Sequence, residues 1–258
     1  MAGWRGGMSA AAHYSFALAY QWWLNCDSYY VAELAGRQAL NASWVRDIGE
    51  TYLVNRTIAK GAEDVFAQLI LHSGQGSDMA ISERAIRLSL ALERHADLKA
   101  DTPASAASKV SWFVWPRGWT MYDRYAAKAV VGTPAESGLA KMERFYAALA
   151  MRGWDDALRQ LRNVMSEFGC PALLAERTLD KYLFLEGSGA AEGGTAIRRI
   201  DGFLNALPGD HRDTINRAGE AVASILEPSR LLHRETRTDR IELKKQLDAL
   251  RVLKREIA

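Results

Sequence analysis

Cysteine is scarce in this sequence, with only 2 among 258 residues. This count excludes a disulfide-built scaffold, a four-cysteine zinc site and a four-cysteine iron–sulfur cluster. Histidine is also scarce, and its 5 residues show no metal-ligand spacing. The glycine-rich run 187–194 lacks the Gly-Lys-Ser/Thr ending of a phosphate-binding loop. We therefore expect neither a metal nor an organic cofactor.

A large excess of charge of either sign is missing as well. The chain has 33 Lys+Arg against 31 Asp+Glu, a net charge of +2, so any site for a polyanion must be local. The segment 230–258 is the clearest asymmetry, with nine Lys/Arg against five Asp/Glu. Its apolar residues recur at helical spacing, namely Leu243, Leu247, Leu250 and Ile257. This predicts an amphipathic C-terminal helix packed on the body, whose basic face is either solvated or lies against a phosphate backbone.

Long uncharged stretches are confined to the N-terminus. Residues 8–24 are apolar enough to mimic a signal peptide, but polar residues such as His13 and Gln21 interrupt them, and no small-residue cleavage site follows. No 18-residue uncharged stretch occurs elsewhere. We predict a buried N-terminal helix in a cytoplasmic protein that has no membrane span.

Helical periodicity dominates what is present. A content of 48% hydrophobic and 9% aromatic residues excludes a disordered chain. Apolar residues recur at positions i, i+3, i+4 and i+7 in four segments, 62–70, 81–92, 142–149 and 154–165. Alternating strand-like segments are almost absent. These patterns predict an all-α protein, and residues 1–258 are interpreted as one helical domain.

Turn residues divide the predicted helices. Thr133, Pro134 and Glu136 form a capping-box pattern with proline at the first helical position, which predicts a helix start there. The runs 72–78 and 187–194 are interpreted as loops from their composition. Glu227-Pro228-Ser229 marks the last break before the C-terminal segment.

The stretch 102–131 holds the candidate site. It starts with small residues and Lys109, continues as an apolar aromatic helix expected to end near Trp115-Pro116, and then forms a short loop. Asp123 stands at the start of the next helix, where free backbone N–H groups and the helix dipole favour an acid. By pattern alone, Asp123 is therefore either a structural cap or a catalytic acid.

The run Ser105 to Ser111 with Lys109, followed by a helix, a proline and Met121-Tyr122-Asp123-Arg124-Tyr125, resembles the core of the helix-hairpin-helix DNA glycosylases. It is most similar to the branch that removes oxidised guanine, as a divergent bacterial member. The resemblance covers about thirty residues and implies that Lys109 is the lysine nucleophile and Asp123 the catalytic aspartate. The family's two hairpin glycines are replaced here by Ser105 and Ala107, and Thr102-Pro103 could instead open one continuous helix.

Base excision assigns roles to the neighbouring residues. A carboxylate near the sugar C1′ stabilises the positive charge that develops there, and an amine of lowered pKa can attack C1′ and give abasic-site lyase activity. Four aromatic residues are expected to form the base pocket or wedge, unless they belong to the core: Trp112, Trp115, Trp119 and Tyr122. Further candidates for the pocket are the N-terminal Trp22, Trp23, Tyr29 and Tyr30. Five residues are expected to contact DNA: Ser105, Ser108, Arg117, Arg124 (unless it pairs with an acid) and Lys128.

The resulting hypothesis is a DNA glycosylase that flips and excises a modified base from double-stranded DNA. The departure from the usual hairpin favours a specialised role, such as defence against phage DNA that carries modified bases. The alternative is a non-catalytic helical DNA-binding or protein-interaction module in which Asp123 is only a cap. The two differ geometrically, because an enzyme needs Asp123 at the mouth of an open pocket with Lys109 nearby.

Overall fold

The computed structural model describes residues 10–73, 78–95, 98, 103–133, 138–232 and 236–257. Within these ranges the chain is helical and has no β-strand, which confirms the all-α prediction. The α-helices are α1 (Ala10–Trp22), α2 (Ser28–Leu34), α3 (Ala42–Thr51), α4 (Glu63–His72), α5 (Ile81–Glu93), α6 (Ala104–Val114), α7 (Arg124–Val131), α8 (Gly138–Met151), α9 (Trp154–Glu167), α10 (Leu174–Ala206), α11 (Gly209–Leu226) and α12 (Arg237–Ile257). A π-helical turn, Trp23–Asp27, links α1 to α2, and a 3₁₀ turn, Asn55–Thr57, follows α3.

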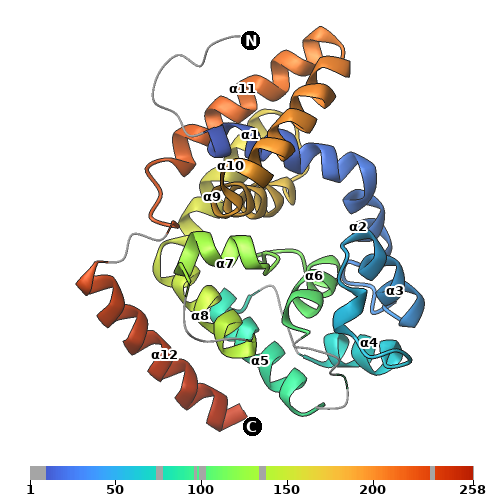
Figure 1. Ribbon diagram of the computed structural model, residues 1–258, viewed down its shortest axis with the longest axis vertical. Coiled ribbons are helices and arrows are strands. Elements are labelled where there is room, and N and C mark those ends of the chain that lie inside the picture. Colours follow the sequence, from blue (N-terminus) through green and yellow to red (C-terminus); the bar gives the residue numbers. More distant parts are fainter. Residues whose placement is uncertain are drawn as a thin grey trace.

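Helices α6 and α7 lie at the centre of the molecule, and three groups of helices surround them (Figure 1). Helix α10 packs against α1, α7 and α9, while α1 also packs against α11. Helices α5 and α8 form a second group, and α12 lies along both of them. Helices α2 and α3 contact α6 from the remaining side, and α4 packs against α3 and α6.

The N-terminal helix and the C-terminal helix both follow the sequence prediction. Phe16 and Leu18 of α1 are buried, as expected for an apolar run that forms core. Helix α12 is amphipathic: Leu243 and Leu250 are buried, while much of its basic surface is exposed. No helix among the described residues is long and apolar enough to span a lipid bilayer.

The predicted loop at 187–194 is a kink within α10 and not a run of irregular residues. Helical geometry is lost only at Gly189, with φ 71° and ψ −172°, where two helical segments meet. At position 187, α10 needs a residue without a side chain. A Cβ there would lie 1.9 Å from the Tyr125 carbonyl oxygen of α7. The glycines therefore permit a kink and a close helix–helix approach.

Two other predicted breaks have different outcomes. The break at 227–229 is confirmed, since α11 ends at Leu226. Within the capping box at 133–136, only Thr133 lies among the described residues, and the described part of α8 begins at Gly138. Residues 74–77 of the predicted loop at 72–78 also lie outside the described residues.

The helix-hairpin-helix element is not confirmed. Ser105 and Ala107, the positions expected in the hairpin turn, lie inside α6, which begins directly after Pro103. The alternative of one helix opening at this proline matches the structure, because without glycine these residues have no preference for left-handed turn conformations. Thr102 lies outside the described residues.

Candidate functional site

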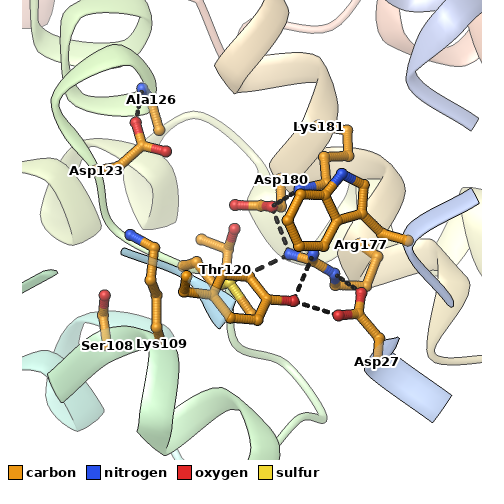
Figure 2. Close-up of polar contacts among 12 residues, drawn as sticks. Asp27, Ser108, Lys109, Thr120, Asp123, Ala126, Arg177, Asp180 and Lys181 are labelled. Carbon is orange, nitrogen blue, oxygen red and sulfur yellow. Dashed lines mark hydrogen bonds and ion pairs between the residues drawn. The ribbon is translucent and has the colours of Figure 1, made fainter. Parts of the chain in front are cut away.

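Asp123 is the N-cap of α7. Its backbone is extended, with φ −145° and ψ 175°, and its Oδ1 accepts hydrogen bonds from the backbone N–H groups of Tyr125 (2.7 Å) and Ala126 (2.8 Å). The second carboxylate oxygen points away from the end of α7 (Figure 2). The predicted cap is confirmed, and it fixes the carboxylate with one oxygen left for another partner.

The loop before Asp123 is held from three sides. Buried Arg84 donates to the carbonyl oxygens of Trp115 (2.6 Å) and Arg117, and the buried Glu176 carboxylate accepts from the N–H of Gly118 at 3.1 Å. Trp119 stacks on Tyr146 with ring centroids 4.2 Å apart. Because the loop is fixed in this way, the position of Asp123 is determined by the core of the protein.

Asp123 lines a cavity of about 440 Å³. Lys109 from α6 and the adjacent Asp180 and Lys181 from α10 line the same cavity. The aromatic part of the wall comes from three residues, Trp22, Tyr52 and Phe184. Two acids and two amines from three helices therefore meet in one pocket, with Asp123 and Lys109 together as the enzyme hypothesis requires.

Lys109 is buried and is held by hydrogen bonds from its ammonium group. Its Nζ donates to Ser105 Oγ at 2.7 Å and to the Tyr122 carbonyl oxygen at 3.3 Å. Burial lowers the pKa of Lys109, and the carboxylates of Asp123 and Asp180 partly oppose that effect. Lys109 is thus a fixed donor facing the cavity.

A buried ion network lies behind the cavity wall. Arg177 of α10 donates through Nε to Asp27 Oδ2 at 2.7 Å and through one terminal nitrogen to Asp180 Oδ2 at 2.6 Å. Tyr52 donates its hydroxyl to the other oxygen of Asp27. Asp27 ends the π-helical turn, and both it and Arg177 are fully buried. Burial alone would lower the pKa of Arg177, but its anionic partners raise it overall.

Lys181 completes the charged wall. Its Nζ lies 3.7 Å from Asp180 Oδ2 and 4.4 Å from the centroid of the Trp22 ring. Burial and the neighbouring Arg177 lower the pKa of Lys181 to about 8, against the opposing effect of Asp180. Figure 2 shows Lys109 and Asp123 on one side of this arrangement and Asp180 and Lys181 on the other.

The four aromatic residues predicted for the pocket do not line the cavity. Trp112 and Trp119 are fully buried and Tyr122 is 8% exposed, while Trp115 is half-buried beside the core. Their place in the core has a physical cause: most of α6 is covered by neighbouring helices, and the loop ring of Trp119 is stacked inside the protein. Among the N-terminal candidates, Trp22 does line the cavity, whereas Trp23, Tyr29 and Tyr30 do not.

The predicted DNA contacts divide into buried and exposed residues. Ser108 is fully buried, and its Oγ accepts from the backbone N–H of Tyr122 at 2.9 Å, so the prediction that it contacts DNA is wrong. Ser105 serves as the acceptor for Lys109. The three basic residues are exposed, namely Arg117, Arg124 and Lys128. Arg124 also pairs with Glu192 at 3.6 Å, the alternative that the sequence left open.

The sequence patterns did not predict five residues of the site, namely Asp27, Tyr52, Arg177, Asp180 and Lys181. A signal was present on α10, where charged residues at 176, 177, 180 and 181 interrupt an otherwise apolar helical run. Charges repeated at helical spacing among leucines indicate buried and paired groups. Asp27 and Tyr52 had no such local signal.

The described residues contain no cluster of His, Cys, Asp and Glu suited to hold a metal ion. Comparisons with protein-family models, with curated proteins and with solved structures found no match to this chain.

Proposed function

We propose that this protein is a DNA glycosylase that excises a modified base from double-stranded DNA. The observation that carries the proposal is the Asp123 carboxylate, fixed by the N-cap of α7 and facing a cavity that also holds Lys109. A simple cap needs neither a cavity nor buried amines beside it. Preorganised charge in a pocket is what cleavage of an N-glycosidic bond requires.

Cleavage of the N-glycosidic bond would use the Asp123 carboxylate in the position where the structure holds it. As the bond from C1′ to the base lengthens, positive charge develops on the sugar, and the free Asp123 oxygen stabilises it. The same carboxylate orients a water molecule and accepts the proton that the water loses as its oxygen forms the new bond to C1′. The base leaves with the bonding electrons and takes up a proton from solvent, and Asp123 returns its proton to solvent. Lys109, held by Ser105 and the Tyr122 carbonyl, lies in the same cavity and places a hydrogen-bond donor beside the reacting sugar.

The size and the lining of the cavity support a base that has left the duplex as its occupant. A volume of about 440 Å³ lies within the range of small-molecule sites. Trp22, Tyr52 and Phe184 supply the apolar faces against which a flipped base packs. These residues take over the role that the sequence assigned to the aromatics of 112–122.

Leu53 is the best-placed residue to fill the gap in the duplex. Its side chain is 82% exposed at the cavity, and its backbone has the left-handed φ of 55°. A leucine in this conformation is strained and exposes apolar surface, two costs that accumulate at functional sites. Insertion between base steps is a known use of an apolar side chain at a DNA interface. Arg117, Arg124, Lys128 and the basic surface of α12 remain the proposed phosphate contacts.

The test compares Asp123→Asn with the wild-type protein. Asparagine caps a helix about as well as aspartate, so the variant keeps the fold and loses only the charge. Base release is measured on duplexes with oxidised, alkylated or bulky modified bases, followed by alkali to cleave abasic sites. We expect a loss of about 100- to 1,000-fold in rate. Equal rates for both proteins would remove Asp123 from the mechanism.

The proposed defence role has its own test. The protein is incubated with phage DNA that carries hypermodified bases and with unmodified DNA of similar sequence, and abasic sites are counted. The defence role predicts an excess of abasic sites in the modified DNA. Equal numbers would contradict this role and leave excision of another damaged base in place.

The second candidate function is a non-catalytic DNA-binding or protein-interaction module. The observation in its favour is the cap itself, because the Oδ1 hydrogen bonds alone give Asp123 a structural reason to exist. This function predicts DNA affinity that falls steeply with salt, or a protein partner, with no base release from any duplex.

A further inference from the structure

The second lysine of the cavity, Lys181, has an environment different from that of Lys109. It lies one helical turn after Arg177 on α10, so two cations are stacked on the same buried face. Asp180 Oδ2 serves both of them, at 2.6 Å from Arg177 and 3.7 Å from Lys181. The negative charge of Asp180 therefore neutralises Arg177 more than it neutralises Lys181.

The other charged neighbours do little to neutralise the positive charge of Lys181. Asp27 is already bonded to Arg177 and Tyr52, Asp123 is bonded to the end of α7, and Lys109 and Arg199 add positive charge to the same cavity. A buried amine beside another cation loses its proton at lower pH than a solvated lysine. The lowered pKa of Lys181, about 8, agrees with this geometry.

The side chain of Lys109 is committed to its hydrogen bonds. Two of its N–H groups point to Ser105 Oγ and the Tyr122 carbonyl, and Asp123 faces it across the cavity. These acceptors fix the direction of the Lys109 Nζ, and burial lowers the pKa of Lys109 as well. Among the described residues, the contacts of the Lys181 Nζ are a long one to Asp180, at 3.7 Å, and one to the Trp22 ring, at 4.4 Å, and the side chain lines the cavity.

We propose that Lys181, and not Lys109, is the amine that forms a Schiff base with the abasic sugar left by base excision, an inference that rests on the proposed glycosylase function. The neutral Nζ attacks C1′ of the ring-opened deoxyribose, which is an aldehyde. A C1′–N bond forms, the aldehyde oxygen takes up the two amine protons and leaves as water, and a C1′=N imine remains. No oxidant or reductant is required for this step.

The experiment uses duplex DNA with a preformed abasic site, so that it does not depend on which base is excised. Borohydride reduces the imine to a stable protein–DNA adduct, which is measured by denaturing electrophoresis for the wild type and for Lys181→Arg, Lys109→Arg and Lys60→Ala. Arginine keeps the positive charge but cannot form the imine. Lys60 is an exposed lysine that does not line the cavity, and it controls for nonspecific trapping.

We expect the adduct of Lys181→Arg to fall below about one tenth of the wild-type yield, with Lys60→Ala retaining most of it and Lys109→Arg losing less than Lys181→Arg. The trapping rate of the wild type should rise with pH and level off above about pH 8, following deprotonation of the amine. Peptide mapping should place the adduct on Lys181.

Three results would overturn the inference: normal trapping by Lys181→Arg, an adduct mapped to Lys109, or no adduct with the wild type. Base release from the modified-base duplexes is measured on the same protein samples. Release without an adduct would refute Lys181 as the nucleophile and leave a hydrolytic glycosylase. Neither release nor an adduct would refute both proposals together.

Discussion

Gly187 is the point where α10 meets the helix that Asp123 caps, and replacing it with alanine should disable the site. An added Cβ would lie 1.9 Å from the carbonyl oxygen of Tyr125 and 2.6 Å from its carbonyl carbon. Ordinary contact begins at about 3.4 Å, so the two backbones must move apart by about 1.5 Å. Tyr125 is two residues after Asp123, and its N–H is one of the donors that hold the carboxylate.

The size of the effect follows from that displacement. Overpacking of a close contact typically costs 1–3 kcal/mol, and here the obstacle is backbone, so we expect a loss of about 3 kcal/mol in the free energy of unfolding. For a protein of this size such a loss lowers Tm by about 6–12 °C. A displacement of about 1 Å in a catalytic group can cost a further 100-fold in rate.

Gly202 provides the matched control on the same helix. A Cβ at Gly202 meets no atom within 4 Å, so Gly202→Ala should stabilise α10 by about 0.5–1 kcal/mol. The assay is thermal unfolding by circular dichroism together with base release at a temperature where both variants are folded. If Gly187→Ala unfolds at the same temperature as Gly202→Ala and keeps its activity, the close approach of α7 and α10 and its role in placing Asp123 are refuted.

Three other substitutions test the charged wall and the wedge. Asp27→Asn should cost about 3–5 kcal/mol in urea unfolding, because it removes the charge that compensates the buried guanidinium of Arg177 and leaves one acceptor oxygen for two donors, Arg177 Nε and the Tyr52 hydroxyl; a cost below about 1 kcal/mol would contradict this. Lys181→Met should raise stability at pH 7 by about 1–3 kcal/mol. The pKa of Lys181 in the folded protein, about 8, lies below its ordinary value of 10.5. The cost of burying the charged amine is therefore complete below pH 8 and disappears as pH rises to 10.5. Urea titrations at pH 7 and 10 should show the stability advantage of Lys181→Met shrinking. Leu53→Gly should raise the free energy of unfolding by up to about 1 kcal/mol by relieving the left-handed backbone, yet lower base release more than tenfold; unchanged release would remove Leu53 from the interface.

The sequence predicted what depends on local interactions. Helix periodicity identified α4, α5, α8, α9 and α12, and the preference of an acid for a helix N-terminus placed Asp123 at the cap of α7. These two features need only neighbours along the chain, so a single sequence contains enough information to find them. The pairing of Asp123 with Lys109 was expected from the resemblance and not from these patterns.

Features that depend on packing between distant helices were not predictable in the same way. An aromatic residue near a catalytic group in sequence is equally compatible with core and pocket, and Trp112 and Trp119 turned out to be core. The cavity wall is completed by Trp22 and Tyr52, which are separated from Asp123 by more than two helices along the chain. The prediction of a loop at 187–194 was inaccurate for a related reason. Only Gly189 leaves helical geometry, and glycine is needed at position 187 because of a carbonyl oxygen on another helix.

The charges of α10 are difficult to explain by stability alone. A buried ion pair such as Asp27–Arg177 can often be replaced by apolar residues of similar volume without loss of stability, and burial of Lys181 beside Arg177 is unfavourable at neutral pH. The same arrangement holds Asp180 at the cavity wall and lowers the proton affinity of an amine that faces the cavity. The proposed reaction would account for this cost, because the Arg177–Lys181 stack then supplies an amine that loses its proton near pH 8.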